Sequence, residues 1–336
     1  MERGTFYNID EHWNILDTSI ENCPIIKHKE NGLILCYIRP NAISKELSDL
    51  AVESYLDAGK MVSTNRGVAA GISHRNKVAH YERGIEANSA IIGYIDSTNH
   101  KRPCRLTAYS KTYFDKYTTG LPFIKCINDC YKDSAPEEYE KQSVFSQLSK
   151  DFLIADTVFS TVTVNYNFRT ALHRDSGDYK DGYGSLVICS KDIEGGLILF
   201  PEYKIAIKPN NGDYIMMDVH EYHCNSEIIV KKEGGYRLAF VCYLREKMWK
   251  CNEINRNLAD LGSLNGELWH TEILFKKIFG KELPEKKVDG KWWTMSNDKF
   301  CLSYKNKRYM LLDKINNKKI QNLIPAWRYI EELDNE

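Results

Sequence analysis

The sequence predicts an α+β protein with a jelly-roll core, helical support before the core and a locally basic extension after it. Between residues 152 and 246, short β-rich runs alternate with Gly and Asp turns at the spacing of a sandwich or jelly roll. Upstream, apolar residues recur at helical spacing. The expected organisation is a mixed helical and loop support region packed on the core (1–150), the core itself (151–248), and a helical, locally basic extension (249–336).

In the support region, Leu33–Ile38 is expected to be a strand and Lys45–Ala58 a helix with Ser44 as its N-cap. Lys111–Tyr131 is expected to be partly helical, and Ala135–Lys150 helical. The core is expected to consist of these strands: Thr157–Tyr166, Gly184–Cys189, Gly196–Phe200, Ile205–Ile207, Asp213–Val219, Ser226–Val230 and Tyr236–Leu244.

Composition limits the class of protein. The 46 Lys and Arg balance 46 Asp and Glu, so no global basic field indicates nucleic acid. Locally, Lys276–Lys319 carries 13 Lys and Arg against 5 Asp and Glu, and residues 250–275 are expected to be helical. No window approaches the roughly 18 consecutive apolar residues of a membrane span. Nothing in the sequence indicates an oligomer.

The ten cysteines are scattered, without a C-x-x-C pair. This distribution favours a reducing intracellular compartment, nucleus or cytoplasm, with mostly buried or idle thiols. Cys126 and Cys130 lie four residues apart on an expected helix, but a zinc site would need two further ligands.

The stretch Asn165–Asp175 is expected to be the end of a strand that carries His173 and Asp175. Residues two apart on a strand point to one face. Alone, the pair also fits a solvated turn, but a third candidate ligand follows the expected Asp213–Val219 strand in the same jelly roll. Two histidines and one carboxylate form the facial triad of non-haem Fe(II) oxygenases, which leaves coordination positions open for a co-substrate and O₂.

The distal histidine is His220 or His223, and we favour His223, which directly precedes Cys-Asn. The other would support it by a hydrogen bond. Arg237 is expected to bind the distal carboxylate of 2-oxoglutarate, because its planar guanidinium makes paired hydrogen bonds to carboxylates. Arg169 alternates in phase with His173 and is expected to face the same cavity, holding co-substrate or an anionic substrate. For both arginines the alternative is a solvent-facing side chain.

At these residues the sequence resembles the TET/JBP family of Fe(II)/2-oxoglutarate dioxygenases, and most closely the thymine hydroxylase domain of base J-binding proteins. The likeness covers roughly residues 60–250. It rests on these segments: Asn167-Phe-Arg-Thr-Ala-Leu-His-Arg-Asp175, Ser176-Gly-Asp-Tyr-Lys-Asp-Gly-Tyr-Gly184, Gly212-Asp-Tyr-Ile-Met-Met-Asp-Val-His220, His223-Cys-Asn and Tyr236-Arg237, with Asn65-Arg-Gly67, Ile91-Ile-Gly-Tyr94 and Pro103-Cys-Arg-Leu-Thr-Ala108 upstream.

The resemblance implies a double-stranded β-helix, His173, Asp175 and His223 as iron ligands, and Arg237 as the 2-oxoglutarate anchor. It also implies hydroxylation of a 5-methylpyrimidine in DNA, with Fe(II), 2-oxoglutarate and O₂. Thymine is favoured over 5-methylcytosine.

A base inside duplex DNA must be flipped out to reach a buried metal. The expected base-contacting residues come from the irregular region 61–110: Asn65, Arg66, Tyr94 and Asp96. Two alternatives remain: a 2-oxoglutarate oxygenase acting on a protein side chain or small molecule, and a non-catalytic DNA-binding relative.

Overall fold

The computed structural model describes residues 1–19, 25–63, 66–71, 87–96, 104–251, 278–280, 293–305, 308–321, 326, 329–330 and 333. The chain divides into two compact units. The first contains Met1–Ile95 and Leu106–Trp249, and the second contains Asp96–Arg105 and Lys250–Glu336. Within the described part of the chain, no helix has the length and apolar character needed to cross a membrane.

The first unit contains helices and strands in mixed order. Its α-helices are α1 (Lys45–Gly59), α2 (Ala108–Thr112), α3 (Phe114–Thr119), α4 (Leu121–Ser134) and α5 (Pro136–Ser146), with short 3-10 turns η1 (Gly67–Ala70), η2 (Gln147–Phe152) and η3 (Glu246–Lys250). Its strands are β1 (Asn14–Asp17), β2 (Ile26–Lys27), β3 (Ile34–Arg39), β4 (Val62–Ser63), β5 (Ala87–Ile95), β6 (Arg105–Leu106), β7 (Thr161–Tyr166), β8 (Gly184–Lys191), β9 (Ile193–Gly195), β10 (Ile198–Phe200), β11 (Ile205–Lys208), β12 (Tyr214–Met217), β13 (Cys224–Asn225), β14 (Ile228–Val230) and β15 (Tyr236–Tyr243).

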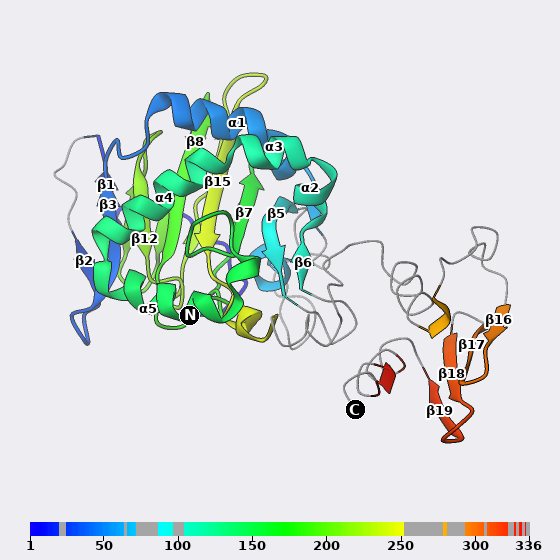
Figure 1. The fold of residues 1–336 in the computed structure, drawn as a ribbon. Helices are drawn as coiled ribbons and strands as arrows, with labels where there is room; N and C mark the ends of the chain where they lie inside the picture. Colours follow the sequence, from blue (N-terminus) through cyan, green and yellow to red (C-terminus); the bar gives the residue numbers. More distant parts are fainter. Residues whose placement is uncertain are drawn as a thin grey trace. The chain divides into compact units, whose positions relative to one another are not determined.

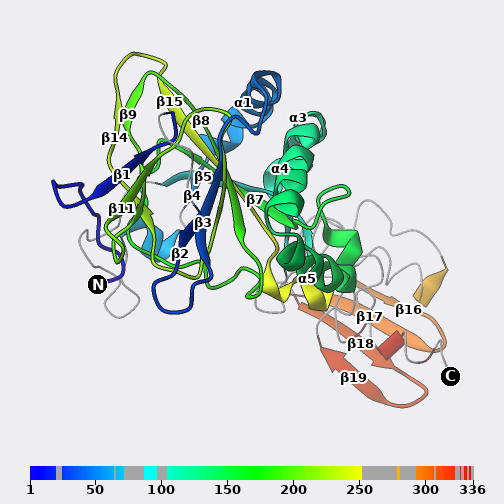
Figure 2. The same cartoon turned by 90° about the vertical axis from the view of Figure 1, so that its left-hand side faces the viewer.

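Two sheets face each other in this unit. The larger follows the order β2-β3-β12-β8-β15-β7-β5-β4, and the smaller follows β1-β11-β10-β13. Figure 2 shows the smaller sheet on one side of the larger and the helices on the other. The jelly-roll core is therefore confirmed. Strands of the expected support region, β1, β3 and β5, complete both sheets.

The two-residue period of the strands builds two separate apolar layers. On β15, Leu238 and Phe240 face one cluster, while Ala239 faces the other. Val187 and Leu186 divide in the same way on β8. Because alternate side chains point to opposite faces, one layer binds the helices and the other closes the space between the sheets.

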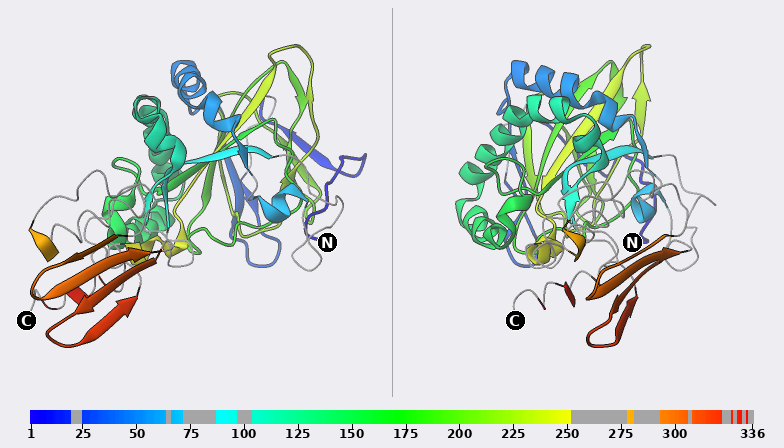
Figure 3. Two further views of the ribbon diagram at one scale, coloured as in Figure 1. Left: turned by 90° about the vertical axis from the view of Figure 1, so that its right-hand side faces the viewer. Right: turned by 45° about the vertical axis from the view of Figure 1, so that its right-hand side comes forward.

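Helices α1, α3 and α4 cover the outer face of the larger sheet (Figure 1). The views in Figure 3 show α1, in blue, on the same side of the larger sheet as the green helices. The side-chain oxygen of Ser44 accepts a hydrogen bond from the Leu47 N–H at 3.3 Å, so the predicted N-cap of α1 is confirmed. Tyr55 of α1 and Phe123 of α4 are fully buried and both lie against Phe240. This packing holds α1 and α4 against the outer face of the larger sheet.

The described part of the second unit differs from the predicted helical extension. Residues 293–321 form an antiparallel sheet of four strands, β16 (Trp293–Ser296), β17 (Phe300–Lys305), β18 (Arg308–Asp313) and β19 (Lys318–Gln321). Leu302 and Leu311 pair across β17 and β18 and are fully buried. The prediction of a helical extension is therefore wrong for residues 293–321. The helix expected over 250–275 falls almost wholly outside the described residues.

Cys104 and Cys251 form a disulfide across a sequence separation of 147 residues. The expectation of idle thiols is wrong for this pair. Sequence spacing carried no signal of it because the two cysteines meet only through tertiary structure.

Candidate metal and co-substrate site

His173 and Asp175 lie on the loop after β7, not at its end as predicted. β7 ends at Tyr166, and the next residue, Asn167, has a left-handed backbone with φ 45°. The loop returns to the smaller sheet, where His173 and His223 exchange backbone hydrogen bonds of 3.0 and 3.1 Å. This single bridge sets the two imidazoles side by side.

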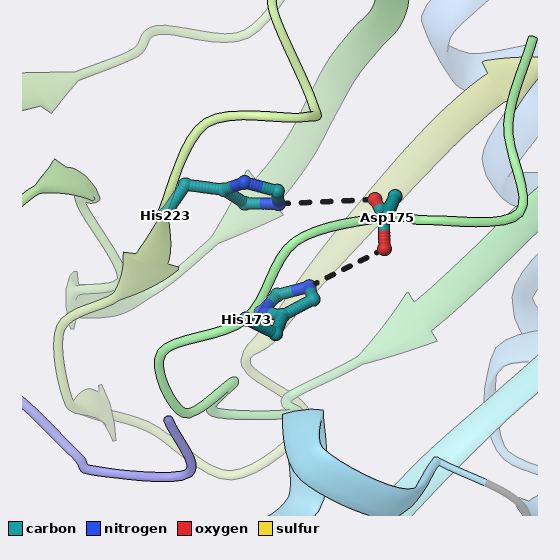
Figure 4. Close-up of side chains that lie close together, drawn as sticks. All are labelled: His173, Asp175 and His223. Atoms are coloured by element: carbon teal, nitrogen blue, oxygen red, sulfur yellow. Dashed lines mark ion pairs between the residues drawn. The ribbon is translucent and has the colours of Figure 1, made fainter. Parts of the chain in front are cut away.

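His173, Asp175 and His223 converge. One Asp175 carboxylate oxygen lies 3.7 Å from His173 Nε2, and the other lies 3.8 Å from His223 Nε2 (Figure 4). One ligand atom from each residue lies within 4.8 Å of the others. Among the described residues this is the one such group of three or more potential metal ligands. Cys126 and Cys130 belong to no such group in the part of the chain that the structure describes.

The hydrogen bonds of both histidines favour metal binding through Nε2. His173 Nδ1 lies 2.8 Å from the Ala171 carbonyl oxygen, and His223 Nδ1 lies 2.9 Å from that of Glu221. A carbonyl oxygen only accepts, so each Nδ1 carries the proton and each Nε2 keeps its lone pair. Burial, and then the neighbouring His173, lower the pKa of His223 to about 4. His223 is therefore neutral at physiological pH, and this donor set fits Fe(II).

His220 points elsewhere. Its Nε2 lies 3.2 Å from the Tyr179 carbonyl oxygen, and it is absent from the residues that line the cavity around the triad. The geometry therefore favours His223 as the distal ligand.

A cavity of about 500 Å³ contains the triad. Strand periodicity builds its floor: Arg237, Ala239, Val241 and Tyr243 share one face of β15 and all line the cavity. Thr163 and Asn165 of β7 extend the floor. Its volume is within the range of small-molecule sites, about 300–1,000 Å³.

Arg237 is buried, with 5% of its surface exposed, in the floor of this cavity. Burial lowers the pKa of its guanidinium to about 10. Gly196, with φ +69°, makes room for it: a Cβ built there would lie 2.7 Å from Arg237 Cδ and 2.8 Å from Nε. A buried cation in a cavity favours an anionic ligand, because pairing offsets the lost hydration.

Arg169 does not line the cavity, contrary to expectation. Its guanidinium donates to the Tyr7 carbonyl oxygen at 2.8 Å and to Asn8 Oδ1 at 2.7 Å, and lies over the Phe6 ring. The predicted alternation fails because the chain leaves β7 before Arg169, so a two-residue period no longer relates it to His173.

The four residues expected to contact the base do not all lie at the cavity. Asn65 lies outside the described residues. Arg66 lines the cavity, whereas Tyr94 and Asp96 do not. Tyr94 contacts the Phe152 ring edge-on in the first unit.

Tyr243 and Asp178 are among the cavity residues that were not assigned from sequence. Tyr243 ends the β15 face that begins at Arg237, and its hydroxyl lies 3.2 Å from Thr163 Oγ1. Extending the two-residue period from Arg237 would have identified it. Asp178 lies within a motif segment, but no sequence pattern shows that burial, followed by the Asp175 charge, raises the pKa of its carboxyl. Those neighbours are set by tertiary structure.

Residues 91–246 match the family model Tet_JBP, described as the oxygenase domain of the 2OGFeDO superfamily. The chain is 30% identical over 237 residues to "Bifunctional helicase and thymine dioxygenase JBP2" of Leishmania braziliensis, covering 66% of this chain and 21% of the relative. It is 30% identical over 166 residues to "Thymine dioxygenase JBP1" of Trypanosoma brucei brucei, covering 48% of this chain and 20% of that protein. The chain thus spans about a fifth of these relatives.

Solved structures show more distant likeness. A structure described as NgTET1 in complex with 5mC DNA is 13% identical, with 70% of this chain and 83% of that chain covered and a TM-score of 0.46. The viral collagen prolyl hydroxylase of Paramecium Bursaria Chlorella virus-1 is 16% identical, with coverages of 62% and 94% and a TM-score of 0.29.

Proposed function

Because residues 91–246 belong to the Tet/JBP family of oxygenase domains, we propose that this chain hydroxylates the 5-methyl group of a pyrimidine in DNA. Thymine is the favoured base, giving 5-hydroxymethyluracil, and 5-methylcytosine is next. The observation that carries the proposal is the convergence of His173, Asp175 and His223 with buried Arg237 in one cavity.

In this proposal, His173 Nε2, His223 Nε2 and an Asp175 oxygen hold Fe(II). The iron, when bound with 2-oxoglutarate and O₂, supplies an oxidant strong enough to attack a methyl C–H bond. Arg237 binds the distal carboxylate of 2-oxoglutarate and so orients the co-substrate. The apolar floor residues Ala239 and Val241 exclude water from the reacting groups.

The DNA substrate is supported by the relatives' names, which describe thymine dioxygenases. The cavity lies between two sheets, so a methyl group stacked within a duplex could not reach it. The proposed reaction therefore requires an extruded base.

The proposal is tested by mass spectrometry of nucleosides from plain duplex DNA and from 5-methylcytosine DNA. Each substrate is incubated with the full chain, Fe(II), ascorbate and 2-oxoglutarate, with His173→Ala as the inactive control. We expect hydroxymethyluracil from plain DNA and none from the variant. Oxidised 5-methylcytosine alone would transfer the assignment to the second base.

Succinate formed without any oxidised base would overturn the DNA substrate and favour an oxygenase of protein side chains or small molecules. No succinate at all, together with DNA binding, would favour a non-catalytic relative.

A further inference from the structure

The N-terminal segment, residues 3–13, lies along the metal-binding loop, residues 167–175. The Gly4 N–H donates to the Leu172 carbonyl oxygen at 2.9 Å, and the Leu172 N–H donates to the Thr5 carbonyl oxygen at 2.8 Å. Leu172 directly precedes the ligand His173. The backbone of the segment is therefore joined to the loop immediately before the first metal ligand.

Side chains hold the N-terminal segment in the same place. Its apolar residues pack in one cluster with the residue before His173 and the residue after His223: Tyr7, Ile9, Trp13, Leu172 and Cys224. Arg169 adds its two hydrogen bonds to Tyr7 and Asn8. Because these contacts involve both histidine-bearing parts of the chain, the segment has a fixed path past the triad.

That path brings Arg3 to the opening of the cavity. Arg3 directly precedes Gly4, whose hydrogen bond to the metal-binding loop fixes the start of the segment. Arg3 is exposed, and it also lines the cavity that contains the triad. A side chain that is open to solvent and lines a cavity lies at its opening, so the N-terminal segment places a positive charge there.

Arg174 is a second cation at the cavity. It lies between the ligands His173 and Asp175, lines the cavity, and has a side chain that is 43% exposed. Its Nη2 donates to Glu221 Oε1 at 3.0 Å, and its guanidinium carbon lies 3.9 Å from the centroid of the Tyr222 ring. A guanidinium has five N–H donors in one plane, so a single bond to Glu221 leaves donors for a further anion.

Resting on the proposed function, we propose that Arg3 and Arg174 form a phosphate-binding rim that holds the DNA backbone next to the extruded nucleotide. A nucleotide whose base enters the cavity keeps its phosphates outside, at the opening. Arginine suits these anions because its planar donors match phosphate oxygens. Arg237, buried in the floor, is left to the co-substrate. Arg3 lies outside the residues that match the family model, 91–246, so that match does not extend to the rim.

The first test measures how DNA binding depends on salt. A single-stranded oligonucleotide with one thymine is bound to the full chain with Fe(II) and 2-oxoglutarate, without O₂ so that no turnover occurs. Fluorescence anisotropy gives the affinity at several salt concentrations. Each phosphate contact contributes about 0.7 to the slope of log affinity against log salt concentration for a single strand. Arg3→Gln and Arg174→Gln should each reduce the slope by about that amount and lower the affinity about two- to fivefold.

The controls separate charge from structure. Arg3→Lys and Arg174→Lys keep the positive charge and should keep the slope. Arg39→Gln is the matched control, because Arg39 is also a partly exposed arginine in an ion pair, with Asp133, but it does not line the cavity. It should change neither slope nor affinity.

The second test locates the contacts on the DNA. Neutral methylphosphonate groups replace the phosphates of the same oligonucleotide one at a time. Wild type should lose affinity when a phosphate next to the thymine is neutralised, and the variant that lacks the matching arginine should lose nothing further there. Full, additive losses at every position would overturn the rim, because arginine and phosphate would then act independently.

The third test concerns the N-terminal segment. Arg169→Leu removes two hydrogen bonds that hold it and should lower the affinity for the oligonucleotide, while the KM for 2-oxoglutarate stays within about twofold. Combining it with Arg3→Gln should add little, since both changes remove the same contact. Full additivity would overturn the placement of Arg3 by this segment.

The outcomes distinguish this inference from the proposed function. If wild type oxidises thymine but both glutamine variants keep its salt slope, the rim is overturned and the proposed function stands. A raised KM for 2-oxoglutarate in Arg3→Gln, with an unchanged slope, would overturn the rim by assigning Arg3 to the co-substrate. If wild type oxidises no base, the proposed function fails, and reduced slopes would then support the rim in a non-catalytic DNA-binding protein.

Discussion

Asn167 and Arg237 hold each other by two hydrogen bonds. The Asn167 N–H donates to the Arg237 carbonyl oxygen at 2.9 Å, and Asn167 Oδ1 accepts from the Arg237 N–H at 2.7 Å. Asn167 adopts φ 45°, a left-handed conformation that asparagine tolerates better than most residues. The pair fixes the point where the chain leaves β7 for the metal-binding loop against the start of β15.

Asn167→Ala should destabilise the protein by about 1–3 kcal/mol, because it leaves the Arg237 N–H without its acceptor and places alanine in a left-handed conformation. Urea unfolding measures the loss. Asn167→Asp keeps an acceptor oxygen and should lose much less. Equal losses in the two variants would show that the side-chain bond is not the cause.

Gly196→Ala should raise the KM for 2-oxoglutarate, because the new Cβ would meet Arg237 Cδ at 2.7 Å and displace the guanidinium. Gly234→Ala is the matched control: it has a similar φ of +79° but nothing within 4 Å of the added Cβ. Both variants carry the backbone strain, of the order of 1 kcal/mol. Initial rates of succinate formation across 2-oxoglutarate concentrations distinguish them, and a similar KM in both would contradict the steric explanation.

Arg237→Leu should raise the KM for 2-oxoglutarate by about 10- to 100-fold, since each hydrogen bond involving a charged group contributes about 1.5–3 kcal/mol. Arg169→Leu, which removes the contacts with Tyr7 and Asn8, should leave that KM within about twofold. Succinate assays of both variants measure the effect. A large increase in KM for Arg169→Leu would restore the role predicted from sequence.

His223→Ala should abolish tight Fe(II) binding, whereas His220→Ala should retain it, because His220 Nε2 is directed at the Tyr179 carbonyl. The loss should exceed the roughly 10- to 100-fold that outer-shell partners of metal sites cost. Anaerobic equilibrium dialysis with Fe(II) measures it. Retained binding in His223→Ala with loss in His220→Ala would reverse the ligand assignment.

Cys126 should react with iodoacetamide at a lower pH than an ordinary thiol. A hydrogen bond from Cys130, and then the Arg39 charge, outweigh burial and lower its pKa to about 7. The thiolate, the reactive form, thus accumulates as pH rises through about 7, rather than through the usual 8.5 or so. Labelling rates by peptide mass spectrometry from pH 5.5 to 9 give the midpoint. Cys130→Ala should move it upward, and an unchanged midpoint would exclude the hydrogen bond as the cause.

The sequence by itself determined the elements whose signal is local. Short β-rich runs bounded by Gly and Asp turns predicted β8 and β15 within a few residues of their ends, and Ser44 with the following apolar spacing predicted α1. Arg237, which the sequence placed near the start of the predicted Tyr236–Leu244 strand, lines the cavity. These predictions succeed because strand and helix periods depend on neighbouring residues in the chain.

Tertiary structure decided what depends on distant residues meeting. Hydrogen bonds to β13 and β15 set the path of the loop from Asn167 to Asp175, so this loop does not follow the two-residue period of a strand. Arg169 therefore points away from the side of His173 and donates a hydrogen bond to Tyr7 in the N-terminal segment. Among the described residues, Arg66 Nε and Asp178 Oδ2 have no hydrogen-bond partner, which no sequence pattern predicts. Cys104 and Cys251 met across 147 residues. Burial and electrostatic environment belong to the folded three-dimensional arrangement, and a one-dimensional pattern does not contain them.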